Sequence, residues 1–321
     1  MRFTSWFNSQ VLRFSLAGAI VTAALIACGG GGFTTPTTLQ ANPSTPWTLL
    51  MAGDIAQCNL LQPSKSNANQ TAELIERQIA AAGSNSNVLT LGDNIYFLGL
   101  TIGYKACFDP TWGRFEDKLF ALPGNHDVEK GGEKNYFDFF GPKASPPGAG
   151  PDRSGYYRLD QSGWTVFTLN SNTDAVTAAA QNVWLKKELA TAKPCVAAAW
   201  HHARFSSAAR GDNALMQEAW EILDLAKADV VVQAHEHHYE RFAPLTSTGV
   251  VVAGAGIRSF VVGTGGADIY GFAGQRANSE KQIETYGVMS MTLEPGKAAW
   301  RFIDVNNTVL DSGAFDCKKK S

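Results

Sequence analysis

The segment Val88-Leu-Thr-Leu-Gly-Asp-Asn-Ile-Tyr96 decides the fold that this sequence predicts. Its first four residues suit a buried strand and lead directly into a Gly-Asp pair. An earlier apolar run, residues 47–52, ends in the same way at Gly53 and Asp54. Between the two runs, residues 72–82 carry apolar side chains at helical spacing. We therefore expect a β-α-β unit with both aspartates at the carboxyl ends of strands, the edge where open α/β sheets bind ligands.

Strand and helix patterns continue to alternate along the rest of the chain. Further strands are expected at 164–170, 195–200 and 229–233, and further helices at 182–192 and 217–226. The part from 249 to 315 is rich in glycine and shows alternating β patterns, so a strand-rich second half is predicted.

The composition is that of a globular protein without a general affinity for nucleic acid. Lys and Arg number 27 against 29 Asp and Glu, the formal net charge is -2, and 45% of residues are hydrophobic. This balance leaves no uniform basic field that would gather nucleic acid. Nucleic acid is therefore not expected as a stable partner, and an anionic substrate must be held by a local site.

The first 27 residues have the pattern of a secretory signal. Arg2 and Arg13 are the only charged residues there, and residues 14–27 are apolar or small. Such a stretch is too short for a membrane-spanning helix of roughly 20 residues, but it suits the apolar region of a signal peptide. A buried N-terminal helix is the alternative.

The residues around Cys28 extend this prediction to a lipid anchor. Leu25-Ile-Ala-Cys28 resembles the lipobox of bacterial lipoproteins, in which the cysteine carries the lipid. The resemblance implies an exported protein of a bacterial cell envelope, lipid-anchored or else periplasmic or extracellular. Residues 28–46 read as a flexible tether and residues 47–321 as one catalytic domain.

Four cysteines remain in the predicted domain. An even number in an exported protein favours disulfides, with four buried free thiols as the alternative. Our hypothesis pairs Cys58 with Cys107, because each follows a candidate site loop, and Cys195 with Cys317, because these flank late strand-like segments.

All six histidines fall in three short clusters, each after a predicted strand or in the loop after one. The clusters are His126, then His201 and His202, then His235, His237 and His238. Together with Asp54, Asp93 and Asn125 they offer nitrogen and oxygen donors, which suit iron, zinc or manganese better than calcium. Taken singly, each motif is also explained by a turn or by a surface histidine pair.

In combination and order, these motifs resemble the signature of the calcineurin-like metallophosphoesterases. Tyr96, three residues after Asp93, resembles the purple acid phosphatase branch in particular, and the chain as a whole looks more like its small single-domain members. Ala56, Ala198 or Ala199, and Ala234 depart from the family pattern, each as one small residue for another. The matching blocks are Asp54, Gly92-Asp93-Asn94-Ile95-Tyr96, Gly124-Asn125-His126-Asp127, Trp200-His201 and Ala234-His235-Glu236-His237.

The resemblance implies an α/β fold, a four-layer α/β/β/α sandwich, with two metal ions at the carboxyl edge of the strands. It makes Asp93 the bridge between the metals. It also assigns Asp54, Tyr96 and His237 to the first metal, and Asn125, His201 and His235 to the second. A tyrosine ligand implies Fe(III) at the first position, with divalent iron, zinc or manganese at the second.

Two histidines remain for the substrate. Neighbouring residues on a strand point apart, so His201 and His202 do not both bind one ion; the resemblance favours His201 as the ligand and leaves His202 for the substrate phosphate. His126 is the expected general acid, positioned by Asp127, and the alternative is that it orients a ligand. Arg204 is a candidate for the phosphate and equally for the surface.

The implied activity is hydrolysis of phosphate monoesters by attack of a metal-bound hydroxide, as in an acid phosphatase. A phosphodiesterase or nucleotidase on the same metal site is the alternative, since loops such as 131–153 choose between the substrates. A binding module that keeps the scaffold without catalysis is a further alternative, which the filled ligand positions disfavour.

Overall fold

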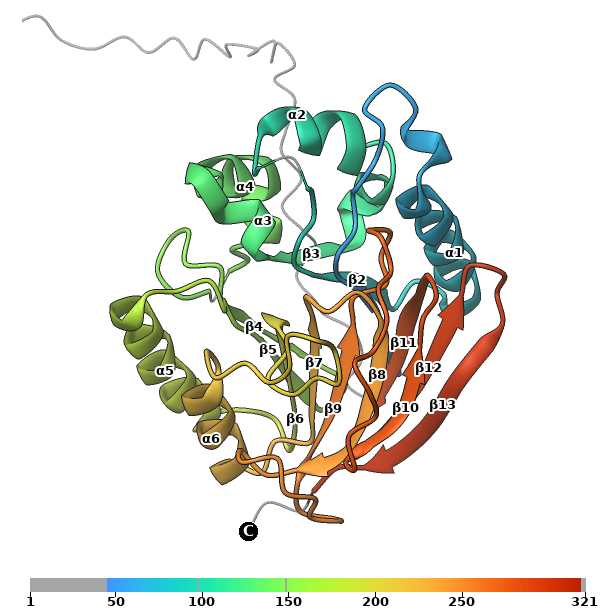
Figure 1. The fold of residues 1–321 in the computed structure, drawn as a ribbon. Coiled ribbons are helices and arrows are strands. Elements are labelled where there is room, and N and C mark those ends of the chain that lie inside the picture. Colours follow the sequence, from blue (N-terminus) through green and yellow to red (C-terminus); the bar gives the residue numbers. More distant parts are fainter. Residues whose placement is uncertain (1–44, 97, 148, 319–321) are drawn as a thin grey trace, which may run out of the picture. The chain divides into compact units, whose positions relative to one another are not determined.

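A computed structural model describes residues 45–318, apart from residues 97 and 148 (Figure 1). The predicted signal peptide, the anchor at Cys28 and all but the last two residues of the tether lie outside the described residues. Across the part of the chain that is described, no helix is long and apolar enough to cross a membrane.

Two mixed sheets form the centre of the fold. In the six-stranded sheet the order is β13-β12-β11-β1-β2-β3, and in the seven-stranded sheet it is β10-β8-β9-β7-β6-β5-β4. The strands of the first are β1 (Trp47–Ala52), β2 (Ser86–Leu91), β3 (Leu119–Leu122), β11 (Gly287–Glu294), β12 (Lys297–Asp304) and β13 (Val309–Asp316). Those of the second are β4 (Tyr157–Gln161), β5 (Trp164–Thr168), β6 (Cys195–His202), β7 (Val230–Ala234), β8 (Tyr239–Leu245), β9 (Ile257–Val262) and β10 (Ser279–Ile283).

Each sheet has a parallel part and an antiparallel part. The strands β1, β2 and β3 run parallel, as do β5, β6, β7 and β9, while the remaining neighbours pair antiparallel. Parallel strands bring their carboxyl ends to one edge of a sheet, so the loops after β1, β2, β6 and β7 are the places to look for a site.

Helices cover the outer faces of both sheets (Figure 1). The helix α1 (Asn67–Ala82) lies beside the six-stranded sheet, and α5 (Ala175–Leu189) and α6 (Gln217–Leu225) lie beside the seven-stranded one. Ser66 and Asp174 cap α1 and α5 with side-chain oxygens that accept backbone N–H groups. The shorter segments are α2 (Thr101–Gly103), α3 (Asn125–Val128), α4 (Glu133–Phe140), η1 (Pro63–Lys65), η2 (Tyr104–Phe108), η3 (Trp112–Lys118), η4 (Glu129–Gly131) and η5 (Gly141–Lys143).

Strand β6 shows why several strands read as continuous apolar runs. Val196 and Trp200 belong to the core between the seven-stranded sheet and its helices, whereas Ala197 and Ala199 belong to the core shared by the two sheets. Both faces of the strand are therefore buried, and no polar face interrupts the run. The core that the two sheets share also includes Leu74 and Ile75 of α1, so the cores confirm the predicted four layers, helix, sheet, sheet and helix.

Two stretches differ from the sequence-based expectation. Helix α5 begins at Ala175 instead of 182, because Val176 and Val183 are exposed and the apolar pattern did not mark the buried face. The stretch 131–153, expected as loops, contains α4, whose aromatic residues Tyr136 and Phe140 pack into the core. Consecutive aromatics there hid the helical period.

Both predicted disulfides are confirmed. Cys58 is bonded to Cys107, which joins the loop after β1 to η2. Cys195 is bonded to Cys317, which fastens the chain after β13 to the start of β6. The second bridge links positions that are 122 residues apart in sequence.

Replacing Cys195 and Cys317 together by alanine should lower the free energy of unfolding by about 2–4 kcal/mol, because the bridge restricts the unfolded chain. Urea unfolding of the oxidised proteins measures the difference. Reductant should lower the stability of the wild-type protein by at least this amount, whereas equal midpoints of variant and wild type would contradict the prediction.

Candidate metal centre

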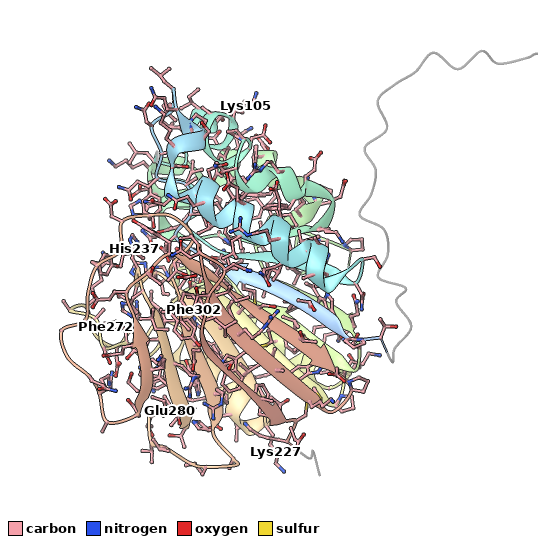
Figure 2. The ribbon with its side chains drawn as sticks, turned by 90° about the vertical axis from the view of Figure 1, so that its right-hand side faces the viewer. Lys105, Lys227, His237, Phe272, Glu280 and Phe302 are labelled. Carbon is pink, nitrogen blue, oxygen red and sulfur yellow. A yellow bond between two sulfur atoms is a disulfide. The ribbon has the colours of Figure 1, made fainter. Side chains whose placement is uncertain are left out.

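The two sheets deliver the predicted ligand residues to one common edge. From the six-stranded sheet come Asp54 after β1, Asp93 after β2 and Asn125 after β3. From the seven-stranded sheet come His201 at the end of β6 and, after β7, His235 and His237. Figure 2 shows His237 at the ends of the strands. The backbone N–H of His235 donates to Asp54 Oδ2 over 2.8 Å, which joins the two groups.

Unusual backbone conformations aim these side chains inward. Asp54, Asp93 and His235 have positive φ angles of 58°, 49° and 71°. Residues other than glycine adopt this region at a cost of order 1–3 kcal/mol, and such residues cluster at functional sites. The loops also press closely together, since a Cβ on Gly124 would lie 2.0 Å from the backbone nitrogen of Asp93.

The first donor cluster consists of Asp54, Tyr96 and His237. The phenol of Tyr96 donates to Asp54 Oδ1 over 2.9 Å and lies 2.9 Å from His237 Nε2. His237 Nε2 and Asp54 Oδ1 are 3.3 Å apart. His237 Nδ1 lies 2.7 Å from the carbonyl of Asp268, so Nδ1 is the donor and Nε2 presents a lone pair to the cluster.

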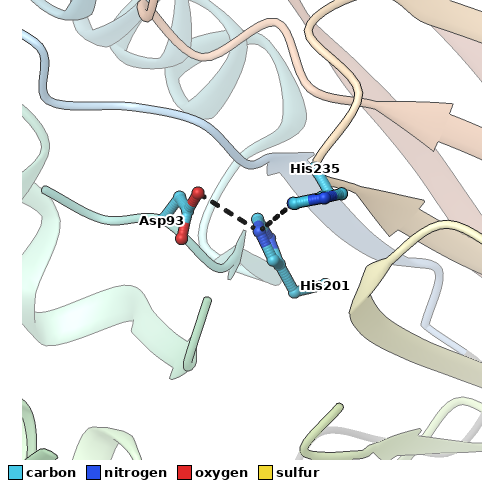
Figure 3. A group of neighbouring side chains, drawn as sticks. All are labelled: Asp93, His201 and His235. Carbon is cyan, nitrogen blue, oxygen red and sulfur yellow. Dashed lines mark hydrogen bonds and ion pairs between the residues drawn. The ribbon is translucent and has the colours of Figure 1, made fainter. Parts of the chain in front are cut away.

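The second donor cluster surrounds His201 (Figure 3). Its Nε2 lies 3.3 Å from Asp93 Oδ2, 3.2 Å from His235 Nδ1 and 3.1 Å from Asn125 Oδ1. Its Nδ1 lies 2.8 Å from the carbonyl of Leu91, which fixes the lone pair of the neutral ring on Nε2. Ligand atoms of Asp93, His201 and His235 all lie within 4.8 Å of one another.

With His201 neutral, acceptor atoms therefore face acceptor atoms, an arrangement that suits a bound cation. Burial alone would lower the pKa of His201, but the carboxylates of Asp93 and Asp54 raise it to about 9. Burial and the neighbouring His201 and His202 lower the pKa of His235 to about 2. Near neutral pH, a proton is therefore bound by His201 and not by His235. Imidazole, carboxylate, amide and phenol donors fit first-row transition metal ions.

His202 lies beside this cluster but bonds in another direction. Its Nδ1 is 2.8 Å from Ser171 Oγ, and its backbone N–H donates to the same oxygen over 3.1 Å. The His202 and His235 ring centroids are 4.5 Å apart. Burial and His201 lower the pKa of His202 to about 3. Sequence reasoning missed Ser171, although it comes after a predicted strand as Asp54 and Asp93 do.

The expected partner of His126 needs a correction. His126 Nδ1 lies 2.8 Å from Glu129 Oε1, and no contact joins its ring to Asp127 among the described residues. Asp127 is fully buried and accepts hydrogen bonds from the backbone of Gly124, from Asn94 and from the phenol of Tyr104. One turn of helix separates His126 from Glu129, so the two side chains share a side. Asp127 instead ties together the loops that carry Asp93 and Asn125.

No sequence motif indicated where two arginines, Arg204 and Arg210, would lie. Arg204, a candidate for the phosphate or the surface, is largely buried, with Nη2 on the carbonyl of Ser247 and its guanidinium over Phe205. Arg210 was not predicted, yet its Nη1 lies 3.4 Å from His235 Nε2. It belongs to an irregular segment without a motif, so the sequence carried no signal for it.

Comparison with known families agrees with this geometry. A model of the calcineurin-like phosphoesterases matches residues 39–239, well over half of the chain. The chain belongs to the calcineurin-like phosphoesterase family, which confirms the family expected from the motifs.

The curated proteins similar to this chain include a purple acid phosphatase. Purple acid phosphatase 23 of Arabidopsis thaliana is 29% identical over 147 residues, which cover 40% of this chain and 32% of that protein. The chain thus matches about a third of the length of this curated relative.

Solved structures show the fold. Purple acid phosphatase PPD1 of yellow lupin matches with a TM-score of 0.66 at 17% identity over 85% of this chain and 54% of that one. GAP50, described as the anchor in the inner membrane complex of Plasmodium, gives 0.66 at 12% identity over 86% and 90%. PhoD gives 0.56 at 10% identity over 88% and 71%.

Replacing Gly124 by alanine should empty the centre without unfolding the protein. The added Cβ would lie 2.0 Å from the backbone nitrogen and 2.2 Å from Oδ1 of Asp93, so the loop that carries Asp93 must shift. We expect the variant to retain less than about a tenth of the metal that the wild-type protein holds, measured by plasma mass spectrometry. Gly274, where a Cβ meets nothing within 4 Å, provides the matched control Gly274→Ala. Equal metal content in both variants would show that this close contact does not set the position of Asp93.

Proposed function

We propose that this protein is a dinuclear-metal phosphoesterase that hydrolyses phosphate monoesters in the manner of a purple acid phosphatase. The observation that carries the proposal is the pair of adjoining donor clusters, one of which contains the phenol of Tyr96. Membership of the phosphoesterase family and the purple acid phosphatase relative support it.

The two clusters divide between two ions. Asp54, Tyr96 and His237 would hold the first, and Asn125, His201 and His235 the second, with Asp93 shared. Two cations at such a site lower the pKa of water and offset the charge of the phosphoryl oxygens. The phenol favours Fe(III) in the first cluster, and the neutral amide of Asn125 favours a divalent ion, iron, zinc or manganese, in the second.

The chain supplies the groups that hold substrate and move protons. The Ser171 hydroxyl accepts the backbone N–H of His202 and lies 2.8 Å from His202 Nδ1, to which it would donate its own proton. His202 is then a neutral ring whose Nε2–H is free to donate to a phosphate oxygen. His126, oriented by Glu129, would give its proton to the leaving oxygen of the ester.

The same proposal places the protein outside the cytoplasm. Two disulfides are typical of exported proteins, and together with the purple acid phosphatase relative they support secretion. The bacterial cell envelope and a lipid anchor at Cys28 are part of the proposal and rest on the sequence of the first 28 residues.

The single variants Asp93→Asn and His235→Ala should each reduce hydrolysis of p-nitrophenyl phosphate at least about a hundredfold, because the first removes the negative charge shared by the two clusters and the second removes an imidazole donor. Circular dichroism should show intact folds. Arg114→Gln, far from the centre in η3, serves as the control and should retain wild-type rates. Substantial activity in both centre variants would sink the proposed function. Rates on the diester bis-p-nitrophenyl phosphate, measured in parallel, decide between monoester and diester preference.

Tyr96→Phe should abolish any visible charge-transfer band of the iron-loaded protein while most of the metal remains. Burial, with the charges of Asp54 and Asp93, raises the pKa of Tyr96 well above its usual value, so a phenolate forms only against a bound cation. The absorption spectrum and the metal content of one sample test this. A band that persisted in the variant would exclude Tyr96 as the chromophoric ligand.

A further inference from the structure

An irregular segment between β6 and α6 carries Arg210 to the edge of the metal centre. The segment is fixed to the loop 263–278, since Ala208 pairs with Phe272, the backbone N–H of Ala273 donates to the carbonyl of Ser207 over 2.9 Å, and Arg276 also bonds to the segment. Figure 2 shows Phe272 on the same side of the molecule as His237. Arg210 itself lies in a turn that the N–H of Gly211 closes onto Ala208. Its position is therefore defined by backbone contacts.

A tyrosine from the facing loop holds the guanidinium. Arg210 Nη1 donates to Tyr270 Oη over 2.8 Å, and Tyr270 Oη donates in turn to the backbone carbonyl of His235 over 2.9 Å. The Tyr270 ring stacks on that of His237, with the centroids 4.5 Å apart. The arginine is thus linked to both histidines of the His235-Glu236-His237 motif through one phenol.

The positive charge is only partly balanced by protein groups. Among the described residues, the carboxylate within ion-pair range is that of Glu236, with Oε2 at 4.0 Å from Nη1, and the side chain of Arg210 is 58% exposed. All contacts of Arg210 within hydrogen-bond distance of described residues are made by Nη1, and Nε and Nη2 have no acceptor among those residues. Arg210 is thus a basic side chain that reaches a candidate ligand directly.

The distance from the centre determines what this arginine can bind. His235 turns Nδ1 toward His201 and presents Nε2 to Arg210 at 3.4 Å. The guanidinium therefore lies beyond the imidazole ring, on the side away from the donor cluster. A phosphoryl group held at the donor cluster would be separated from Arg210 by the imidazole ring of His235. A second charged group on the same molecule could extend past this ring to the guanidinium of Arg210.

We propose that Arg210, positioned by Tyr270, is an anion subsite that selects phosphate esters bearing a second anionic group, such as a carboxylate. A guanidinium fork matches a carboxylate through two parallel hydrogen bonds. The inference rests on the proposed function, because it assumes that the reacting phosphate is held at the donor clusters.

Non-hydrolysable phosphonates test the subsite without catalysis. The metal-loaded wild-type protein should bind 3-phosphonopropionate about tenfold more tightly than propylphosphonate, which replaces the carboxylate by a methyl group. Calorimetry measures both dissociation constants. Arg210→Gln should remove this preference, and Arg114→Gln, an equal change of charge elsewhere, should keep it.

Kinetics on a matched pair of esters complete the test. The ratio of kcat/KM for 3-phosphoglycerate to that for glycerol 3-phosphate should fall about tenfold in Arg210→Gln. Equal losses on both esters would mean that Arg210 contacts the reacting phosphate, which overturns the subsite. An unchanged ratio with an unchanged phosphonate preference would overturn it as well. If the wild-type protein hydrolysed esters but bound both phosphonates equally, only the subsite would be overturned. If it neither hydrolysed esters nor bound the phosphonates, the proposed function would be overturned as well.

Discussion

The structure depends on a cluster of nitrogen and oxygen ligand atoms whose lone pairs point toward one another at the common edge of the two sheets. Carboxylate, amide and imidazole acceptors lie 3.1–3.3 Å from His201 Nε2, an arrangement that repels itself unless a positive charge lies within it. The backbone carbonyls of Leu91 and Asp268 lie within hydrogen-bond distance of Nδ1 of His201 and of His237, so Nε2 of each neutral ring keeps its lone pair for the cluster. Strained backbone at Asp54, Asp93 and His235 is retained around this cluster, as is expected where function outweighs local stability.

Much of the architecture could be predicted from patterns visible in the sequence. The runs before Asp54 and Asp93 indicated parallel strands because a strand buried on both faces has no polar side, and β6 shows the same property on a longer scale. Parallel strands then carry the residues that come after them to a common edge. The clustering of Asp54, Asp93, Asn125 and the histidines could thus be predicted before any contact was known, and the grouping into one edge is what the structure displays.

Other features had no periodic signal. Helix α4 was hidden because aromatic residues occupy consecutive positions, on both its buried and its partly exposed sides. The partner of His126 was misassigned because adjacency in sequence favoured Asp127, whereas one helical turn brings Glu129 alongside. Arg210 and Tyr270 lie in irregular segments that meet only through tertiary pairing, and no spacing rule connects two such segments 60 residues apart.

The origin of the donors in two separate sheets has a mechanical consequence. Asp54, Asp93 and Asn125 move with one sheet and His201, His235 and His237 with the other, so any sliding between the layers pulls the donors apart. A cation bound there would link the two halves of the sandwich. It would raise the free energy of unfolding by about 4 kcal/mol when the free ion exceeds its dissociation constant a thousandfold. The same donor residues would then hold the ion and keep the two sheets in register.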